Sequence, residues 1–273
     1  MKKKILDLKN ISFSYFNKKI IDGISLEIYE DEIISIIGCN GSGKTTLGKI
    51  ISLLLEIDSG EIFFYGKKID FNSSDIYNIR KNIGFIFQNP NNQFFGLTVR
   101  DDIAFGLENN LVSADNIEKK IKLVSEKMKI ADLLDKDVQH LSGGQKHKVA
   151  IADVLVLEPK IIIFDESFAM LDAINKKDIL DLIKNIKNKY HITVIYITHN
   201  LEETLNSDKI IVLEKGKIFL SGSPIEVFTQ KNKLNLINMD VPFIFKLNEK
   251  FKEESLIKEY HYDLDDLIKN ICK

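Results

Sequence analysis

One short segment constrains this chain more than any other part of its sequence. Residues 38–45 read Gly-Cys-Asn-Gly-Ser-Gly-Lys-Thr and match G-x-x-x-x-G-K-[ST] at every fixed position. An apolar strand at residues 33–37 precedes the segment, and a helix predicted from about residue 44 to residue 56 follows it. Glycines let successive backbone N–H groups surround phosphate oxygens, and the start of a helix adds partial positive charge. The pattern therefore predicts a phosphate-binding loop that opens an α/β unit with a parallel sheet.

Within this loop, each residue type has a defined role toward a nucleoside triphosphate. Lys44 is expected to reach the β- and γ-phosphate oxygens, and Thr45 to place its hydroxyl on Mg²⁺. The other residues predicted to contact the nucleotide here are Gly38, Asn40, Gly41, Ser42, Gly43 and Thr46. A chance match to the pattern is expected in about 1% of chains of this length. The flanking strand and helix lower that frequency further.

Such a loop needs an acidic partner at the end of a neighbouring strand. The apolar run Ile161–Phe164 is followed directly by Asp165 and Glu166. Asp165 is expected to hold the Mg²⁺ shell, and Glu166 to orient the water that attacks the γ-phosphate. Two acids after a strand more often form a solvated strand end, so this interpretation depends on their pairing with the loop.

Residues 141–145, Leu-Ser-Gly-Gly-Gln, come immediately before a further predicted helix. They match the LSGGQ signature of the ABC ATPase superfamily, which the chain resembles over about residues 5–230. Two glycines after a serine suit a helix N-terminus, where free N–H groups can bind phosphate. The resemblance implies that ATP and Mg²⁺ are the cofactors, and it places four residues at a nucleotide: Ser142, Gly143, Gly144 and Gln145.

Four more positions match the family individually, and the resemblance alone implies their roles. Gln88 matches the Q-loop glutamine, which senses Mg²⁺ and the attacking water, and His199 matches the switch histidine at the γ-phosphate. Tyr15 matches the aromatic residue that stacks on adenine, and Asp172 matches the D-loop at the dimer interface. The predicted catalytic residues are therefore Glu166, His199, Gln88 and Lys44, and the predicted metal-binding residues are Thr45, Gln88 and Asp165.

The sequence departs from the common ABC pattern around its acidic pair. Common members read Asp-Glu-Pro-Thr, then a small residue, Gly and Leu-Asp, whereas residues 165–172 read Asp-Glu-Ser-Phe-Ala-Met-Leu-Asp. Met170 before Leu-Asp resembles one of the two ATPase subunits of energy-coupling factor (ECF) transporters, as do residues 87–95 and 98–106. This resemblance implies ATP-driven uptake of vitamins or transition-metal ions through a partner membrane protein.

The resemblance also implies a set of partners. The family's signature motif acts on the nucleotide of another subunit, so a head-to-tail dimer is expected. A heterodimer with a homologous second ATPase is favoured over a homodimer, together with an integral membrane coupling protein and substrate-binding membrane subunits. The chain is expected to be a peripheral subunit at the cytoplasmic face of the cell membrane.

Composition limits other classes of function. Lys and Arg total 38 against 40 Asp and Glu, so no excess of positive charge is available for a nucleic-acid backbone and no nucleic-acid partner is expected. The longest apolar runs are about four residues, far below the roughly 18–20 of a membrane-spanning helix. Cys39 and Cys272 form no CxxC motif or Cys/His cluster, which argues against a zinc site and favours a reducing cytosol.

Hydrophobic periodicity gives the expected organisation of the chain. Alternating apolar residues predict antiparallel β-structure before the loop, and a period near 3.6 predicts a helical subdomain at about residues 89–158. The predicted fold class is α/β, a P-loop ABC ATPase fold whose mainly parallel sheet carries an antiparallel β-subdomain and a helical subdomain. This domain is expected over residues 1–230, and residues 231–273 are expected to form a C-terminal appendage that contacts another subunit.

Four other classes of protein explain the sequence less completely. Another ABC transporter ATPase would share every catalytic residue, and only the ECF-like segments argue against it. A soluble ABC ATPase of DNA repair or translation would normally carry two cassettes or a long coiled-coil insertion, and this sequence shows neither. A P-loop kinase or GTPase gives no reason for residues 141–145 or His199, and a non-hydrolysing interaction module would be expected to have lost Lys44 or Glu166.

Overall fold

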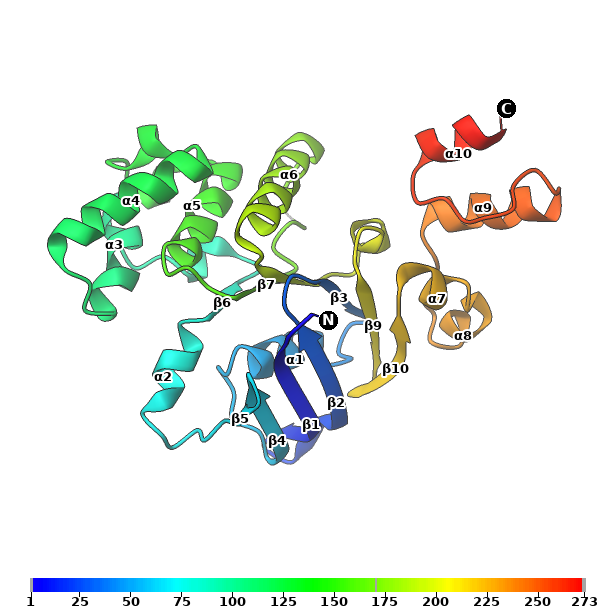
Figure 1. Cartoon of the computed structure of the whole chain (residues 1–273), viewed down its shortest axis with the longest axis horizontal. Coiled ribbons are helices and arrows are strands. Elements are labelled where there is room, and N and C mark those ends of the chain that lie inside the picture. The colour runs from blue at the N-terminus through cyan, green and yellow to red at the C-terminus, as the bar shows by residue number, and fades with distance from the viewer. Residues whose placement is uncertain (1, 170, 272–273) are drawn as a thin grey trace.

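The structure, a computed structural model, describes residues 2–169 and 171–271 and contains two sheets with helices around them (Figure 1). Met170, which carries part of the ECF resemblance, and Cys272 lie outside the described residues. The strands are β1 (Lys4–Tyr15), β2 (Lys18–Tyr29), β3 (Ile33–Gly38), β4 (Ser59–Phe64), β5 (Lys67–Lys68), β6 (Ile83–Ile86), β7 (Ile161–Asp165), β8 (Thr193–Ile197), β9 (Lys209–Glu214) and β10 (Lys217–Gly222). The α-helices are α1 (Lys44–Ile51), α2 (Asp75–Arg80), α3 (Val99–Asn109), α4 (Ala114–Met128), α5 (Gly143–Leu155), α6 (Ala173–Tyr190), α7 (Pro224–Phe228), α8 (Lys231–Leu236), α9 (Phe243–Glu253) and α10 (Leu264–Ile271).

The larger sheet has the strand order β10-β9-β3-β8-β7-β6. Its strands run parallel from β6 to β9, and β10 adds an antiparallel edge. The strand β3, which leads into the phosphate-binding loop, lies in the interior of the sheet, where Ile34 pairs with Ile195 on one side and Lys209 on the other. All residues of β7 and β8 are buried, as expected for parallel strands covered on both faces. The predicted mainly parallel core is confirmed.

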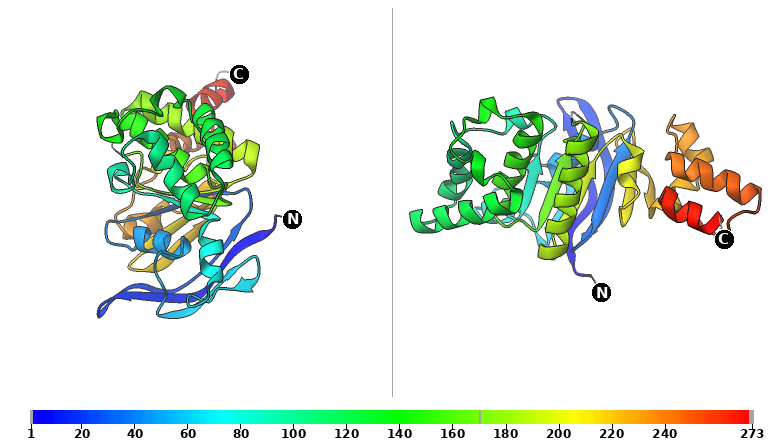
Figure 2. Two further views of the ribbon diagram at one scale, coloured as in Figure 1. Left: turned by 90° about the vertical axis from the view of Figure 1, so that its left-hand side faces the viewer. Right: turned by 90° about the horizontal axis from the view of Figure 1, so that it is seen from above.

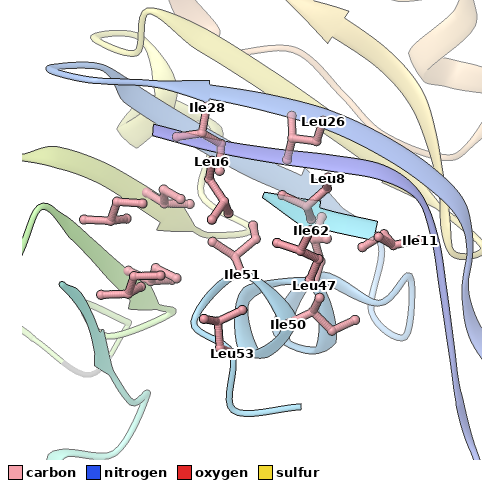
Figure 3. Close-up of a cluster of buried hydrophobic side chains, with 14 of the residues drawn as sticks. Leu6, Leu8, Ile11, Leu26, Ile28, Leu47, Ile50, Ile51, Leu53 and Ile62 are labelled. Atoms are coloured by element: carbon pink, nitrogen blue, oxygen red, sulfur yellow. The ribbon is translucent and has the colours of Figure 1, made fainter. Parts of the chain in front are cut away.

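The smaller sheet has the order β2-β1-β4-β5, and its neighbouring strands are antiparallel. The register between β1 and β2 shifts between Leu8 and Ile11, where the apolar alternation of the sequence changes phase. The inner face of this sheet packs on α1, and Figure 3 shows Leu6, Leu8 and Ile28 facing the side chains of that helix. This packing fixes the helix that follows the phosphate-binding loop.

The helix after the loop is shorter than the sequence predicts. It ends at Ile51 instead of residue 56, because Leu53 takes a left-handed conformation with a φ of 60°. The amides of Leu54 and Leu55 then both donate to the Lys49 carbonyl, at 2.9 and 3.3 Å. The turn directs the Leu53 side chain into the core between the two sheets, where it is fully buried (Figure 3).

Helices α3, α4 and α5 form a unit at one side of the larger sheet and share a second apolar cluster with α6 and β7. The first of them begins at a capping box, in which the Thr98 hydroxyl and the Asp101 carboxylate each accept a backbone N–H. Helices α7–α10 lie on the opposite side of the sheet, as the right-hand view of Figure 2 shows. Among the described residues, no helix combines the length and apolar character that crossing a membrane requires.

The C-terminal helices share a third apolar cluster with the larger sheet. Ile37 of β3 and Val212 of β9 pack there with Phe228 and Phe245. The Cys39 thiol in the phosphate-binding loop also donates to the Ile237 carbonyl, with a sulfur-to-oxygen distance of 3.1 Å. The loop is therefore in direct contact with the last part of the chain.

Candidate active site

A cavity of about 450 Å³ opens beside the loop that joins β3 to α1. Its lining residues come from the β1–β2 turn, this loop, the start of α1, and the segments after β6 and β7: Tyr15, Lys18, Ile20, Asn40, Gly41, Gly43, Lys44, Thr45, Thr46, Gln88 and Glu166. Gly41 and Gly43 have φ values of 79° and 104°, a region in which glycine carries no steric penalty. A Cβ at Gly38 would lie 2.3 Å from the Leu213 carbonyl oxygen, so the loop also needs glycine where it passes β9.

The loop holds a buried cation and an unpartnered hydroxyl. Lys44 is 6% exposed, and its ammonium group donates to the carbonyl oxygens of Gly38 at 2.9 Å and Cys39 at 3.2 Å. The Ser42 hydroxyl oxygen is buried and has no hydrogen-bond partner. Buried polar groups normally find partners, so this orphaned hydroxyl, next to a lysine and a helix N-terminus, fits a site that binds anionic oxygens.

The start of α1 is tied to the end of β7. The Thr45 hydroxyl donates to a carboxylate oxygen of Asp165 at 2.9 Å. Burial raises the pKa of Asp165 and the nearby Glu166 charge adds to the rise, while the bond from Thr45 opposes it. A hydroxyl and a carboxylate side by side are hard oxygen donors, the type that Mg²⁺ prefers. Mg²⁺ in nucleotide sites is held by one or two protein oxygens together with phosphate and water, which fits this pair.

Three predicted catalytic side chains, those of Gln88, Glu166 and His199, meet directly after Asp165 at the end of β7. The Gln88 amide nitrogen lies 3.4 Å from Oε2 of Glu166, and Nδ1 of His199 lies 3.5 Å from the same oxygen. The Glu166 backbone is left-handed, with a φ of 48°, and its N–H donates to the Ile197 carbonyl at 2.8 Å. This conformation is uncommon for residues other than glycine.

The signature residues lie apart from this cavity. Ser142 caps α5 in a capping box with Gln145, and Ser142 and Gly143 are exposed to solvent. None of residues 142–145 is among the residues that line the cavity. Within the part of the chain that the structure describes, the loop and the signature therefore form two separate surfaces.

Asp172 lies beside the signature and not beside the cavity. Its carboxylate caps α6 by accepting the N–H groups of Ile174 and Asn175, and these bonds, that of Asn175 first, lower the pKa of Asp172. The Asn175 side chain lies against the second signature glycine, because a Cβ at Gly144 would be 2.8 Å from its amide oxygen. Asn175, which donates to the Asp172 carboxylate, thus connects the two motifs within one chain.

Three residues near the site have positions that the sequence patterns do not reveal. Lys18 and Ile20 line the cavity because the β1–β2 turn brings them next to Tyr15, which is 41% exposed. Phe168 is 4% exposed, and its ring centroid lies 5.2 Å from that of Phe164. The only sequence signal for Phe168 is its departure from the common motif, which does not indicate an inward side chain.

The sequence and the fold are similar to those of known ABC transporter proteins. The profile of the ABC transporter family matches residues 21–169. The Energy-coupling factor transporter ATP-binding protein EcfA of Malacoplasma penetrans is 42% identical over 273 residues, covering 100% of this chain and 94% of that protein. EcfA1 of Bacillus subtilis is 40% identical over 272 residues, covering 98% and 96%. Among solved structures, cbiO1 from Clostridium perfringens, described as part of the ABC transporter complex cbiONQ, matches with a TM-score of 0.78 and 36% identity, covering 91% of this chain and 100% of that chain.

Proposed function

The chain belongs to the ABC transporter family, among the energy-coupling factor ATP-binding proteins, and on this premise we propose that its loop at residues 38–45 and the acidic pair after β7 form the ATP-hydrolysing site of an ECF-type importer. The observation that carries this assignment is the meeting of Gln88 and His199 on one carboxylate oxygen of Glu166, beside the phosphate-binding loop. Hydrolysis at this site powers uptake of vitamins or transition-metal ions through a partner membrane protein.

Binding of ATP uses groups that are already in place around the cavity. The triphosphate lies in the loop, where backbone N–H groups and the Lys44 ammonium group compensate its charge, and the Ser42 hydroxyl gains a partner. Tyr15 stacks on the adenine. Thr45 and Asp165, with Gln88 nearby, hold Mg²⁺, which when bound neutralises charge on the phosphate oxygens.

Glu166 acts on the water molecule in the chemical step. Its carboxylate accepts a hydrogen bond from water and points the oxygen at the γ-phosphorus. The new P–O bond forms in line with the breaking bond to the β–γ bridging oxygen, the Glu166 carboxylate takes up the proton that the water loses, and ADP leaves. His199 and Gln88 hold the Glu166 carboxylate from two directions, and His199 contacts the γ-phosphate. Positioning and charge stabilisation supply most of the catalysis in reactions of this class.

A second ATPase subunit completes the site. The signature residues Ser142 and Gly143 are exposed and lie outside the cavity of their own chain, which leaves them free to contact a nucleotide held by another subunit. We infer a head-to-tail dimer in which each ATP lies between one loop and one signature. A heterodimer is favoured, and the dimer associates with an integral membrane coupling protein and substrate-binding membrane subunits at the cytoplasmic face of the membrane.

The parts of the chain divide this work. Residues 1–230 form the ATPase domain, and the helical subdomain at about residues 89–158 carries the signature and moves against the membrane partner when the dimer closes. Residues 231–273 contact another subunit. This last assignment is supported by large apolar side chains that α9, α10 and the segment between them leave exposed: Phe243, Leu256, Leu264 and Ile268.

Substitution of Glu166 tests the proposal. Glu166→Gln keeps the shape of the side chain but removes the charge, so kcat for ATP hydrolysis by the assembled transporter is expected to fall about 100-fold or more, while ATP affinity stays near that of wild type. Lys44→Ala should instead lose ATP binding as well as turnover. Glu56→Gln, at an exposed position outside the site and the C-terminal segment, serves as the matched control. A Glu166→Gln variant that turns over at the wild-type rate would overturn the assignment.

A further inference from the structure

The residue after Glu166 makes a buried hydrogen bond that links two strands. Ser167 is 1% exposed, and its hydroxyl lies 3.0 Å from the Ile86 carbonyl oxygen, to which it donates. The Asp165 carbonyl is a second, more distant acceptor at 3.4 Å. The shorter bond connects the turn that follows β7 to the last residue of β6.

This bond lies where the pairing of the two strands stops. Strand β6 is an edge strand of the larger sheet and pairs with β7, and their ladder ends with Ile86 opposite Phe164. Two residues beyond Ile86 the chain reaches Gln88, which lines the cavity. The Ser167 hydroxyl therefore holds the end of an edge strand at the point from which Gln88 is presented to the site.

The turn that carries Glu166 is already fixed on its other sides. The Glu166 N–H is bonded to the Ile197 carbonyl of β8, and its carbonyl accepts the Ala169 N–H at 3.2 Å. Phe168 anchors the turn in the core, where its ring lies against Phe164 and Tyr196. With β7 and β8 holding the turn, the distance between Glu166 and Gln88 depends on how β6 is attached to it.

We propose that Ser167 is a positioning residue for ATP hydrolysis: its bond to the Ile86 carbonyl sets the spacing between the Gln88 amide and the Glu166 carboxylate. The inference rests on the proposed roles of these two side chains. Removal of the Ser167 hydroxyl leaves the Ile86 carbonyl without its side-chain donor, so the end of β6 can move. Small displacements of catalytic groups reduce the rate strongly. Substrate affinity changes little, because other groups bind the substrate.

Paired substitutions in the full-length chain, assembled with its transporter partners, test this role. Ser167→Ala should lower kcat about tenfold, with KM for ATP within about twofold of wild type and a midpoint of thermal unfolding no lower than that of the Ser125→Ala control. Ser167→Thr keeps the hydroxyl and should recover most of the rate. Ser125→Ala is the matched control, because Ser125 is also 1% exposed and donates to a backbone carbonyl, that of Lys122 in α4, and it should match wild type. The Mg²⁺ concentration for half-maximal rate should rise for Ser167→Ala alone.

Several outcomes would overturn the inference. One is a Ser167→Ala variant with the wild-type kcat; another is a folded Ser167→Thr variant as slow as Ser167→Ala. A rate loss that comes with an equal change in KM and a lower unfolding midpoint would show a structural role only. If Ser167→Ala does not fold, Ser167→Cys, similar in size but a weak donor, takes its place in the same comparison. Glu166→Gln, measured alongside, separates the two claims: if it is inactive while Ser167→Ala is normal, only the Ser167 inference fails, and if it is active the proposed function itself fails.

Discussion

At the residue scale, the carboxyl group of Asp153 lies buried beside that of Asp102. Both of its carboxyl oxygens are shielded from solvent. Burial raises the pKa of Asp153 well above the ordinary carboxyl range, and the neighbouring Asp102 charge raises it further. Asp102 has bonds of its own, because one of its oxygens accepts the N–H groups of Phe95 and Gly96, both at 2.6 Å. In the folded protein, Asp153 therefore holds its proton at pH values where an exposed carboxyl group has lost it.

This raised pKa gives a pH-dependent stability with a definite sign. Above the ordinary pKa of a carboxyl group, the unfolded chain releases a proton that folded Asp153 retains, so the protein loses stability as the pH rises toward the folded pKa. Asp153→Asn has no proton to lose. Its midpoint of thermal unfolding should exceed that of wild type by about 2–6 °C at pH 8, with a smaller difference at pH 5. Calorimetry at both pH values checks this, with the exposed Asp178→Asn as control, and an Asn variant no more stable at pH 8 than at pH 5, relative to wild type, would contradict it.

The sequence predicts the residues of the site whose role follows from their type and their place in a motif. Lys44 and Thr45 belong to this group, because a strand followed by a glycine loop and a helix leaves few positions for them, and so does Asp165, because it directly follows an apolar strand. The sequence does not predict that Ser167 and Phe168 point inward. That direction depends on the left-handed turn at Glu166, which is held by contacts from β6 and β8 that are distant in sequence.

At the element scale, the starts of α5 and α6 touch through the signature. A Cβ at Gly144 would lie 2.8 Å from the Asn175 amide oxygen, whereas a Cβ at Gly143 meets nothing within 4 Å. Asn175 cannot swing aside freely, because its amide nitrogen donates to the Asp172 carboxylate at 2.6 Å. The two adjacent glycines thus differ in what they permit: the second allows two helices to approach, and the first faces solvent.

Alanine at each glycine tests this difference. Gly144→Ala should destabilise the isolated subunit by about 1–3 kcal/mol through overpacking, and Gly143→Ala should be near neutral or slightly stabilising, because alanine is the better helix former. Asn175→Ala added to Gly144→Ala should recover part of the loss. Urea denaturation of the variants gives these values. Equal destabilisation by the two single substitutions would show that the contact with Asn175 does not matter.

Most elements could be predicted from hydrophobic period, and the errors fall where tertiary contacts end an element. The buried strand at residues 161–164 and the loop-to-helix unit are confirmed, because a short apolar run before two acids and a glycine loop before a helix former are strong local signals. The helix after the loop was predicted to residue 56 but ends at Ile51. Its apolar run Leu53–Leu55 continues the sequence pattern, and only the core between the two sheets, with its place for Leu53, explains the turn.

At the scale of the whole molecule, the separation of loop and signature predicts what the chain associates with. Purification from membranes in mild detergent should yield this chain with a second, homologous ATPase, one helical membrane protein and small substrate-binding membrane subunits. Mass spectrometry of the purified complex identifies each component, and ATP with Glu166→Gln should increase the ATPase dimer by blocking its turnover. Recovery of the chain alone in the soluble fraction, or on ribosomes or DNA, would leave the ATPase chemistry standing but remove the transport role.

The interior position of β3 sets the order in which the site can be built during synthesis. The strand that leads into the phosphate-binding loop emerges from the ribosome early, yet its neighbours in the sheet are β8 and β9, near the end of the ATPase domain. Until both have been translated, this apolar strand has unpaired edges. The hydrogen bond from the Cys39 thiol to the Ile237 carbonyl can form only later, because Ile237 follows both strands in the sequence. Pairing at such long range makes folding slow and leaves the nascent chain prone to aggregation. ATP binding can therefore stabilise the folded state only when translation is nearly complete.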